Sequence, residues 1–145
     1  MIRAEDTIFY SIERTIKAYR KLAQSKIKQV DPRISVDQSW MIKELLDNPD
    51  SSQVDLANLL FKDVASITRM MELMVKKGFV HRRVNPENRR RNLLEVSKKG
   101  KRVVDKISPA TIKNRENALK GISKKELKAC RAVLDKIFNN LFSNA

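Results

Sequence analysis

The sequence predicts a mainly α-helical fold that contains one short antiparallel β-hairpin. Three observations indicate this: apolar residues recur at helical spacing along most of the chain, Ser and Asp recur where helices would begin, and two apolar runs flank a turn-forming Asn-Pro-Glu-Asn at 85–88. With 145 residues, 41% of them hydrophobic, the chain is long enough to bury a core of its own. We therefore expect one series of helices, interrupted once by the hairpin.

The first half of the chain is predicted to hold four helices. One apolar stripe runs over residues 5 to about 29 and ends at Asp31-Pro32. A capping box of Ser35 and Gln38 opens a second helix over 36–47. A short helix over 53–60, capped by Ser52, precedes a helix over 63–77 that is capped by Asp63 and closed by Gly78. We expect Val36, Trp40 and Leu45 or Leu46 on the inner face of the second helix, only partial burial of Val54, Leu56, Ala57, Leu59 and Leu60 in the third, and an inward stripe of Ile67, Met70, Met71, Met74 and Val75 in the fourth.

The second half is predicted to hold the hairpin and two longer helices. A helical tract starts at Ser97, and Pro109 is expected to kink or break it before it resumes at Ile112. Gly121 stops the tract, and a last helix over about 124–142 carries a heptad-like apolar seam. A short helix, a turn, a second helix and a hairpin in this order make a winged helix-turn-helix, which we assign to residues 35–106, with 1–34 and 107–145 as flanking helical regions.

The chain is strongly basic, and most of its charge lies in one stretch. The formal net charge is +14, and residues 76–102 contribute +9 of it through eleven Lys or Arg and two Glu. Such a balance favours a polyanionic partner, above all nucleic acid. A basic run by itself is as often a solvated surface as a binding site, but here it directly follows the predicted helix-turn-helix.

A helix that enters the major groove of DNA must present small or hydrogen-bonding side chains near its N-terminus. The helix over 63–77 satisfies this with Val64, Ala65, Ser66, Thr68 and Arg69. Arg69 is the best candidate for contact with a guanine edge or a phosphate. Arginines at the tip of the hairpin, at 89–91, suit a narrow minor groove better than lysines would, because lysine is more strongly hydrated.

Other kinds of function have little support in the sequence. No apolar stretch approaches the roughly 20 residues of a membrane span and no signal core is present, so we expect a cytoplasmic protein with no membrane partner. His81 and Cys130, one of each type, argue against a metal site. Cys130 is interpreted as a small buried apolar residue, with a redox sensor as the alternative. No nucleophile–base pair, phosphate loop or carboxylate dyad stands out, so we expect neither an enzyme nor a cofactor.

The segment LANLLFKDVASITRMMELMVKKGFVHRRVNPENRRRNLLEVSKKG resembles the DNA-binding core of the MarR family of bacterial transcription regulators. The resemblance extends from about Pro49 to Gly100. It implies that Ala65–Arg69 match the family's S-T-V-T-R, that Asn88–Arg90 match the D-R-R of its wing, and that Val96–Gly100 match its L-T-x-x-G. Two departures are visible: Asn88 is neutral where the family has an acid that braces an arginine, and Ala65 replaces the usual serine.

The resemblance also implies an obligate homodimer formed by the first and last helices. The interface residues expected on this basis are Ile8, Ile12, Ile16, Leu127, Leu134, Phe138 and Leu141. The expected DNA contacts outside the recognition helix are Ser52, Gln53 and Lys62, together with the wing residues Arg83, Asn88, Arg89, Arg90 and Arg91. The predicted function is a homodimeric regulator that binds double-stranded DNA at a pseudo-palindromic operator and acts as a repressor by blocking polymerase. A small-molecule effector is left open, and a sequence-indifferent nucleic-acid-packaging protein is the alternative.

Overall fold

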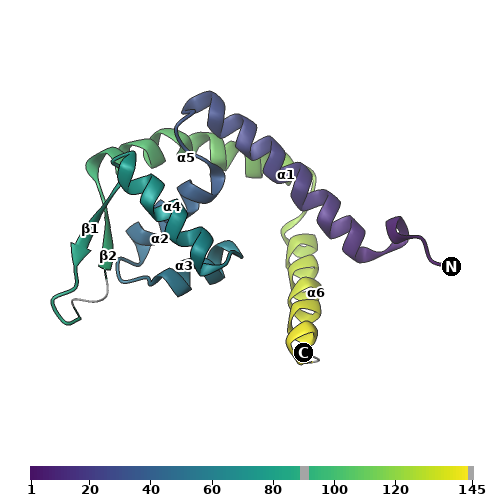
Figure 1. Ribbon diagram of the computed structural model, residues 1–145. Helices are drawn as coiled ribbons and strands as arrows, with labels where there is room; N and C mark the ends of the chain where they lie inside the picture. The colour runs from purple at the N-terminus through teal and green to yellow at the C-terminus, as the bar shows by residue number, and fades with distance from the viewer. Residues whose placement is uncertain (89–91, 144–145) are drawn as a thin grey trace. The chain divides into compact units, whose positions relative to one another are not determined.

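The computed structural model describes residues 1–88 and 92–143. Its elements are, in chain order, a 3-10 turn (Ala4–Asp6), α1 (Ile8–Val30), α2 (Val36–Asp47), α3 (Gln53–Leu60), α4 (Val64–Lys76), β1 (Val80–Val84), β2 (Asn92–Val96), α5 (Lys98–Ala118) and α6 (Lys124–Ser143) (Figure 1). The predicted class, mainly helical with one antiparallel hairpin, is confirmed. The chain divides into two compact units, Met1–Asn114 and Arg115–Ala145. The domain limits inferred from the sequence stay predictions.

Local capping sets where the helices of the first unit begin. Ser35 Oγ accepts a hydrogen bond from the Gln38 backbone N–H at 3.1 Å, and Gln38 Oε1 accepts one from the Ser35 N–H at 3.0 Å. Ser52 and Asp55 form the same reciprocal pair ahead of α3, at 3.1 and 2.8 Å. Each box satisfies backbone donors that would otherwise lack partners at a helix start. The predicted limits of α2 and α3 are therefore confirmed.

Helix α1 starts later than expected. Thr7 is its N-cap and accepts from the Tyr10 backbone N–H at 3.3 Å, so residues 4–6 form a separate turn. The other end is fixed by Asp31, whose side chain is 2% exposed. Its carboxylate accepts from the Arg33 side chain at 2.9 and 2.7 Å and from the Arg33 backbone N–H at 3.0 Å, and it lies 3.7 Å from Lys106 Nζ of α5. The end of α1, the following loop and α5 are thus joined around one buried carboxylate.

The core of the first unit lies between α2, α3, α4, the base of the hairpin, the second half of α1 and the first half of α5. Its most deeply buried apolar side chains are Met41, Ile42, Leu56, Ile67, Met74, Phe79 and Val80. The prediction that Trp40 faces inward is wrong, because Met41, Ile42 and Leu45 fill that side of α2 and leave Trp40 37% exposed. The expectation of only partial burial in α3 is wrong in both directions: Leu56, Ala57 and Leu60 are buried, at 7% exposed or less, while Val54 and Leu59 are exposed at 55% and 38%. The core therefore uses a narrower face of α2 and α3 than the sequence indicated.

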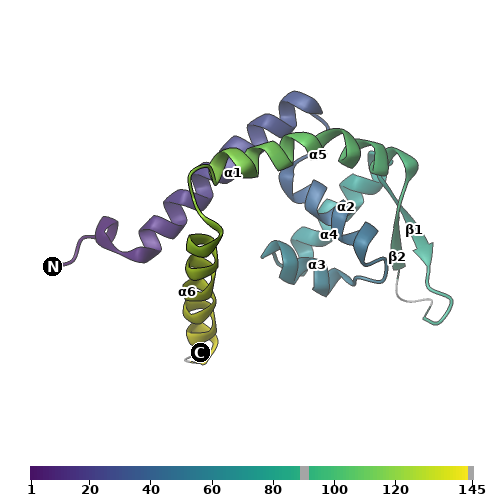
Figure 2. The ribbon, with the colours of Figure 1, turned by 180° about the vertical axis from the view of Figure 1, so that it is seen from behind.

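The hairpin is joined closely to the helices on either side of it. Val80 pairs with Val96 at its base and Val84 with Asn92 near its tip. Gly78, at φ +77°, ends α4 as predicted, and the Ser97 hydroxyl donates to the Gly78 carbonyl at 2.5 Å. A Cβ on Gly100 would lie 2.2 Å from the Phe79 carbonyl oxygen, so only glycine allows α5 to approach β1 this closely. Figure 2 shows α5 leaving the hairpin at this joint.

Helix α5 contradicts the expectation of a break at Pro109. It runs without interruption from Lys98 to Ala118 with Pro109 inside it. Proline removes one backbone donor from the helix. Nearby hydroxyls bond back to the helix on either side: Ser108 donates to the Val104 carbonyl at 2.8 Å and Thr111 to the Ile107 carbonyl at 3.3 Å. The carbonyl that Pro109 leaves without its helical donor is that of Asp105, and neither of these two bonds reaches it; the helix continues past the proline on its other backbone hydrogen bonds.

The second unit consists of the last turn of α5, a turn at Gly121 with φ +78°, and α6. Ser123 and Glu126 form the predicted capping box, at 3.1 and 2.8 Å, so the start of α6 is confirmed. No described residue of α6 is buried. The interpretation of Cys130 as buried is wrong for this chain, because its side chain is exposed. The seam of α6 is therefore apolar but uncovered.

Candidate nucleic-acid interface

The turn between α3 and α4 has a specific backbone geometry. The Lys62 N–H donates to the Ala57 carbonyl at 2.9 Å and the Phe61 N–H to the Asn58 carbonyl at 3.4 Å, which is the Schellman pattern of helix ends. Phe61 takes the left-handed position of that pattern, with φ 54° and ψ 43°, where glycine is the usual residue. Its side chain is 85% exposed. The turn is thus closed by backbone bonds and carries an aromatic ring on its outside.

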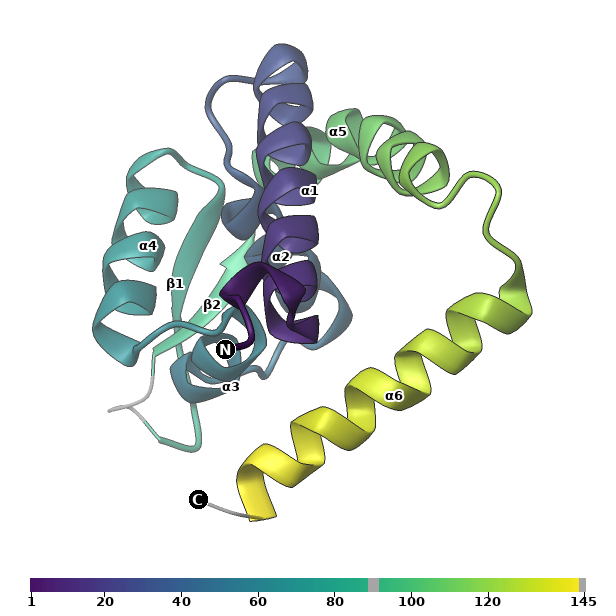
Figure 3. The same cartoon turned by 90° about the vertical axis from the view of Figure 1, so that its right-hand side faces the viewer.

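Asp63 caps α4, as predicted. Its carboxylate accepts from the Ser66 backbone N–H at 2.6 Å, and this bond holds the pKa of Asp63 below its usual value. The carboxylate remains ionised at neutral pH and completes the first turn of the helix. Figure 3 shows α4 beside the hairpin, with α3 at its N-terminal end.

The outer face of α4 carries the five residues predicted to contact DNA. Val64, Ala65 and Arg69 are exposed, while Ser66 and Thr68 are half-buried. Arg69 Nη2 donates to Ser66 Oγ at 3.1 Å, so these two polar side chains meet on the surface. The Thr68 hydroxyl lies within hydrogen-bond distance of the Val64 carbonyl, at 3.0 Å, and of Gln53 Oε1, at 3.2 Å. Thr68 and Gln53 therefore link α4 to α3.

The predicted contacts outside α4 have roles within the protein. Ser52 is the N-cap of α3. Lys62 forms an ion pair with Asp37 of α2 at 3.2 Å, and Asp37 also accepts from Arg20 of α1 at 2.6 Å. Burial opposes ionisation of Asp37, but hydrogen bonds from Arg20 and Lys62 still hold its pKa below the usual value. Lys62 thus ties the turn to α2, and its contact with a phosphate stays a prediction.

The hairpin tip begins with the turn chemistry that the sequence indicated. Asn85 Oδ1 accepts from the Glu87 N–H at 3.0 Å, and the Asn85 carbonyl accepts from the Asn88 N–H at 3.2 Å. Arg83 is exposed on β1, opposite Leu93. The predicted wing contacts Arg89, Arg90 and Arg91 lie outside the described residues. The consequence of a neutral Asn88 for those arginines stays a prediction.

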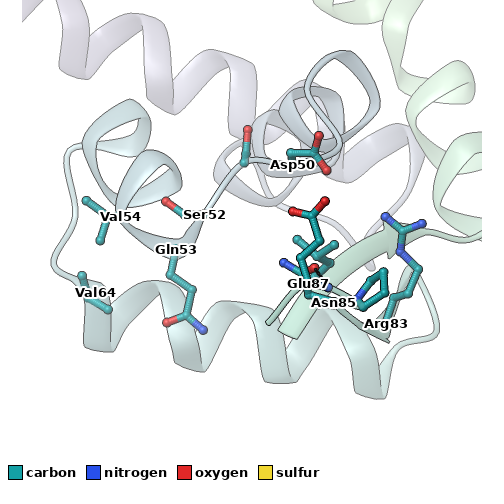
Figure 4. Close-up of a pocket in the computed structure, with 11 residues that line it drawn as sticks. Asp50, Ser52, Gln53, Val54, Val64, Arg83, Asn85 and Glu87 are labelled. Carbon is teal, nitrogen blue, oxygen red and sulfur yellow. Dashed lines mark hydrogen bonds between the residues drawn. The ribbon is translucent and has the colours of Figure 1, made fainter. Parts of the chain in front are cut away.

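A concavity of about 760 Å³ separates the start of α3 and α4 from the hairpin. Figure 4 draws Val54 and Val64 toward one end of it, and Asp50, Glu87 and Arg83 toward the other. Its remaining lining residues are Ser51, Ser52, Gln53, Asn85, Pro86 and Leu93. The two carboxylates were not anticipated from the sequence, since their approach depends on how the hairpin packs beside α3. The surface is therefore mixed, with an apolar end and a charged end.

A family model of the MarR family matches residues 35–91. The chain carries a MarR-family domain. The matched segment covers α2, α3, α4 and β1, and it includes every residue that lines the concavity except Leu93 of β2. The resemblance noted from the sequence motifs is thereby confirmed.

Solved structures share the fold of this chain over nearly its whole length. The MepR–DNA complex of S. aureus has a TM-score of 0.83 at 18% identity and covers 96% of this chain and 99% of its own. The structure of BpsR from Bordetella bronchiseptica, which concerns the regulation of its DNA binding by 6-hydroxynicotinic acid, has a TM-score of 0.83 at 18% identity. The match covers 94% of this chain and 96% of BpsR. A mutant MarR of E. coli complexed with operator DNA has a TM-score of 0.80 at 20% identity, and the match covers 90% of this chain and 92% of that one. At these identities the similarity concerns the fold.

The helices that flank the MarR-family domain expose their apolar stripes. Among the residues predicted at a dimer interface, Ile12 and Leu127 are half-buried, and the exposed ones are Ile8 (55%), Ile16 (47%), Leu134 (39%), Phe138 (51%) and Leu141 (59%). The rings of Phe138 and Phe142 meet at a centroid distance of 4.8 Å. Apolar stripes of this extent are typical of surfaces that another chain covers.

Two further observations bear on other kinds of site. Among residues 1–88 and 92–143, no group of three or more His, Cys, Asp or Glu residues is placed to hold a metal ion. No helix in that part of the chain is both long and apolar enough to cross a membrane.

Proposed function

We propose that this protein is a sequence-specific, double-stranded DNA-binding transcription regulator that acts as a homodimer. The observation that carries the proposal is the exposed N-terminal face of α4, which lies across the concavity from a basic hairpin within a MarR-family domain. The arrangement therefore suits a helix in the major groove, with the wing on the adjacent backbone or minor groove.

In this proposal the residues have distinct roles. Arg69 reaches a base edge or a phosphate from α4, together with Ser66, to which it is already bonded. Gln53 and Ser52 approach the backbone from the start of α3, and the wing arginines approach the minor groove. Sequence is read from α4, while the wing adds affinity that depends strongly on salt.

The dimer is proposed from the uncovered apolar stripes of α1 and α6. A two-fold axis that pairs these stripes would place two copies of α4 on one face of DNA. The operator would then be pseudo-palindromic, with half-sites about one helical turn apart. The DNA complexes of MepR and of MarR support this proposal through their shared fold.

Regulation is proposed to be repression in the cytoplasm of a bacterial cell, by a dimer that blocks polymerase. The regulation of BpsR by 6-hydroxynicotinic acid supports a small-molecule effector for this chain as well. Such an effector would favour a dimer whose two recognition helices no longer match the spacing of the half-sites.

The test is a competition experiment. A duplex is selected from a random library with the full-length protein, and its binding is measured against excess random duplex at a fixed salt concentration. We expect a specificity ratio of at least about 10³. The net charge of +14 also suits a protein that packages nucleic acid without regard to sequence. A ratio near one would establish that alternative and overturn the proposed function.

A further inference from the structure

Val54 and Val64 form a small apolar patch on the surface that would meet DNA. They come from different helices, the first turn of α3 and the first residue of α4, and both line the concavity, where Figure 4 draws them toward the same end. Both are exposed, at 55% and 43%. Covering a valine side chain contributes a favourable free energy in proportion to the apolar area removed from water. Contact of this patch with an apolar partner would therefore contribute favourably to the free energy of binding.

The polar side chains nearest this patch are already engaged within the protein. Ser66 Oγ accepts from Arg69, and the Thr68 hydroxyl is directed to α3 and to the Val64 carbonyl. The first two residues of α4, Val64 and Ala65, are exposed and have hydrocarbon side chains. The side chains of the part of the recognition helix that would enter the groove first thus offer methyl groups and no polar atoms.

Only one apolar group lies on the base edges of the major groove, the C5 methyl of thymine. A valine cannot bond to the donors or acceptors of the other base edges. If a valine covered such an edge, the base would lose its hydrogen bonds to water without replacement. We propose that Val54 and Val64 read thymine methyl groups and that each operator half-site carries thymines at the positions facing them. This inference rests on the proposed function and assigns specificity at those positions to a methyl group.

The local structure holds the two valines in place before DNA arrives. The capping box of Ser52 and Asp55 fixes the start of α3, and Asp63 fixes the start of α4. The approach of Thr68 Oγ1 to Gln53 Oε1, at 3.2 Å, links the two helices beside the patch. Valine also has a restricted χ1 angle, so little side-chain freedom is lost on binding. A fixed pair of this kind discriminates between thymine and uracil better than flexible side chains would.

The experiment replaces operator thymines with deoxyuridine, one at a time, in the duplex selected by the full-length protein. This change removes the methyl group and leaves base pairing intact. We expect affinity to fall about fourfold for each methyl group that the patch covers, and to stay unchanged at other thymines. The specificity ratio against random duplex is measured in the same preparation.

The protein variant Val54→Ala with Val64→Ala tests the assignment. Its affinity for the thymine duplex should fall, while its affinities for the thymine and deoxyuridine duplexes should become equal. Each variant is its own control for folding, because one preparation is compared on two duplexes. Val64→Thr keeps the shape of the side chain and exchanges one methyl for a hydroxyl, so it should lose part of the preference for thymine.

The possible results separate this inference from the function on which it rests. A high specificity ratio with no effect of deoxyuridine at any position would overturn the inference and leave the proposed function standing. A deoxyuridine effect that persists undiminished in the double variant would assign the methyl contacts to other residues and also overturn it. A specificity ratio near one would overturn both this inference and the proposed function.

Discussion

The winged helix-turn-helix and helix α6 both carry apolar stripes at helical spacing, but only the first stripe is covered. In α4 the stripe residues Ile67, Met71 and Met74 are at most 4% exposed. In α6 the corresponding residues Leu134 and Phe138 are 39% and 51% exposed. Periodicity therefore tells which side chains share a face, and it does not tell what covers that face. The difference indicates that the winged part covers its own apolar stripe, whereas the second unit does not cover the stripe of α6 by itself.

The largest effect is expected when a charge is placed on the α6 stripe. Phe138→Asp should prevent dimer formation, since a carboxylate cannot be buried there without a partner. Affinity for a two-site operator should then fall by at least about 100-fold, because the second half-site is no longer bound by a linked subunit. Analytical ultracentrifugation and DNA titration measure the two effects. Asn139→Asp adds the same carboxylate, with the same change in net charge, at an exposed polar position of α6 and should change neither. A Phe138→Asp variant that stays dimeric would contradict the comparison.

The next effect concerns the basic charge of the two regions. Replacing Arg89, Arg90 and Arg91 with Ala should lower affinity by about 10-fold to 100-fold and flatten the dependence of log K on log salt by about one unit per lost phosphate contact. Circular dichroism should show an intact fold. The matched control replaces Lys124, Lys125 and Lys128 with Ala, which removes the same charge near the start of α6. Equal changes in the salt slope for both variants would mean that net charge, and not the wing, determines binding.

A smaller effect is expected at the buried carboxylate of Asp31. Asp31→Asn should lower the free energy of unfolding by about 1–3 kcal/mol, because Arg33 and Lys106 lose their partner, although Arg33 is half-exposed and keeps some hydration. Hydrogen bonds from the Arg33 side chain hold the pKa of Asp31 below its unfolded value of about 3.9. The contribution is therefore complete above that value and is lost as the pH falls through the folded-state pKa.

Chemical denaturation at several pH values measures the contribution of the Asp31 carboxylate to the free energy of unfolding. The difference in stability between the natural chain and Asp31→Asn should be constant from about pH 5 upward and should shrink below about pH 4. A difference that does not depend on pH would show that the carboxylate contributes through packing alone.

The smallest expected effect is a gain in stability at Phe61. Phe61→Gly should raise the free energy of unfolding by about 0.5–1 kcal/mol, because glycine adopts the left-handed conformation without steric cost. Thermal unfolding should show a higher Tm. Phe61→Ala removes the ring but keeps the Cβ, so it should give little of this gain. If both variants lose stability, the exposed ring makes contacts that stabilise the fold.

The elements that the sequence predicted well are those determined by neighbouring residues. The capping pairs of Ser35 with Gln38 and of Ser52 with Asp55 act within one helical turn, so the starts of α2 and α3 could be read directly. Of the expected kink or break at Pro109, the break was wrong, because one missing backbone donor does not end a helix whose other backbone bonds are made; the kink stays a prediction.

Features that depend on distant residues could not be predicted in this way. The exposure of Trp40 is decided by which side of α2 meets α3 and the hairpin. The approach of Asp50 and Glu87 to one concavity joins segments more than 30 residues apart in the chain. Cys130 lies on an apolar stripe, but no rule of periodicity states whether the same chain covers it. Long-range packing, and not local propensity, sets these outcomes.

The joint at Gly100 has a mechanical consequence. The Ser97 backbone N–H donates to the Phe79 carbonyl at 3.0 Å, and Lys99 Nζ donates to the Lys77 carbonyl at 2.7 Å, so the first turn of α5 is bonded to the end of α4 and the start of β1. With no space for a Cβ at Gly100, these three segments cannot slide past one another. A rotation of α5 must therefore carry the recognition helix and the base of the wing as one lever arm, whose displacement grows with distance from the joint.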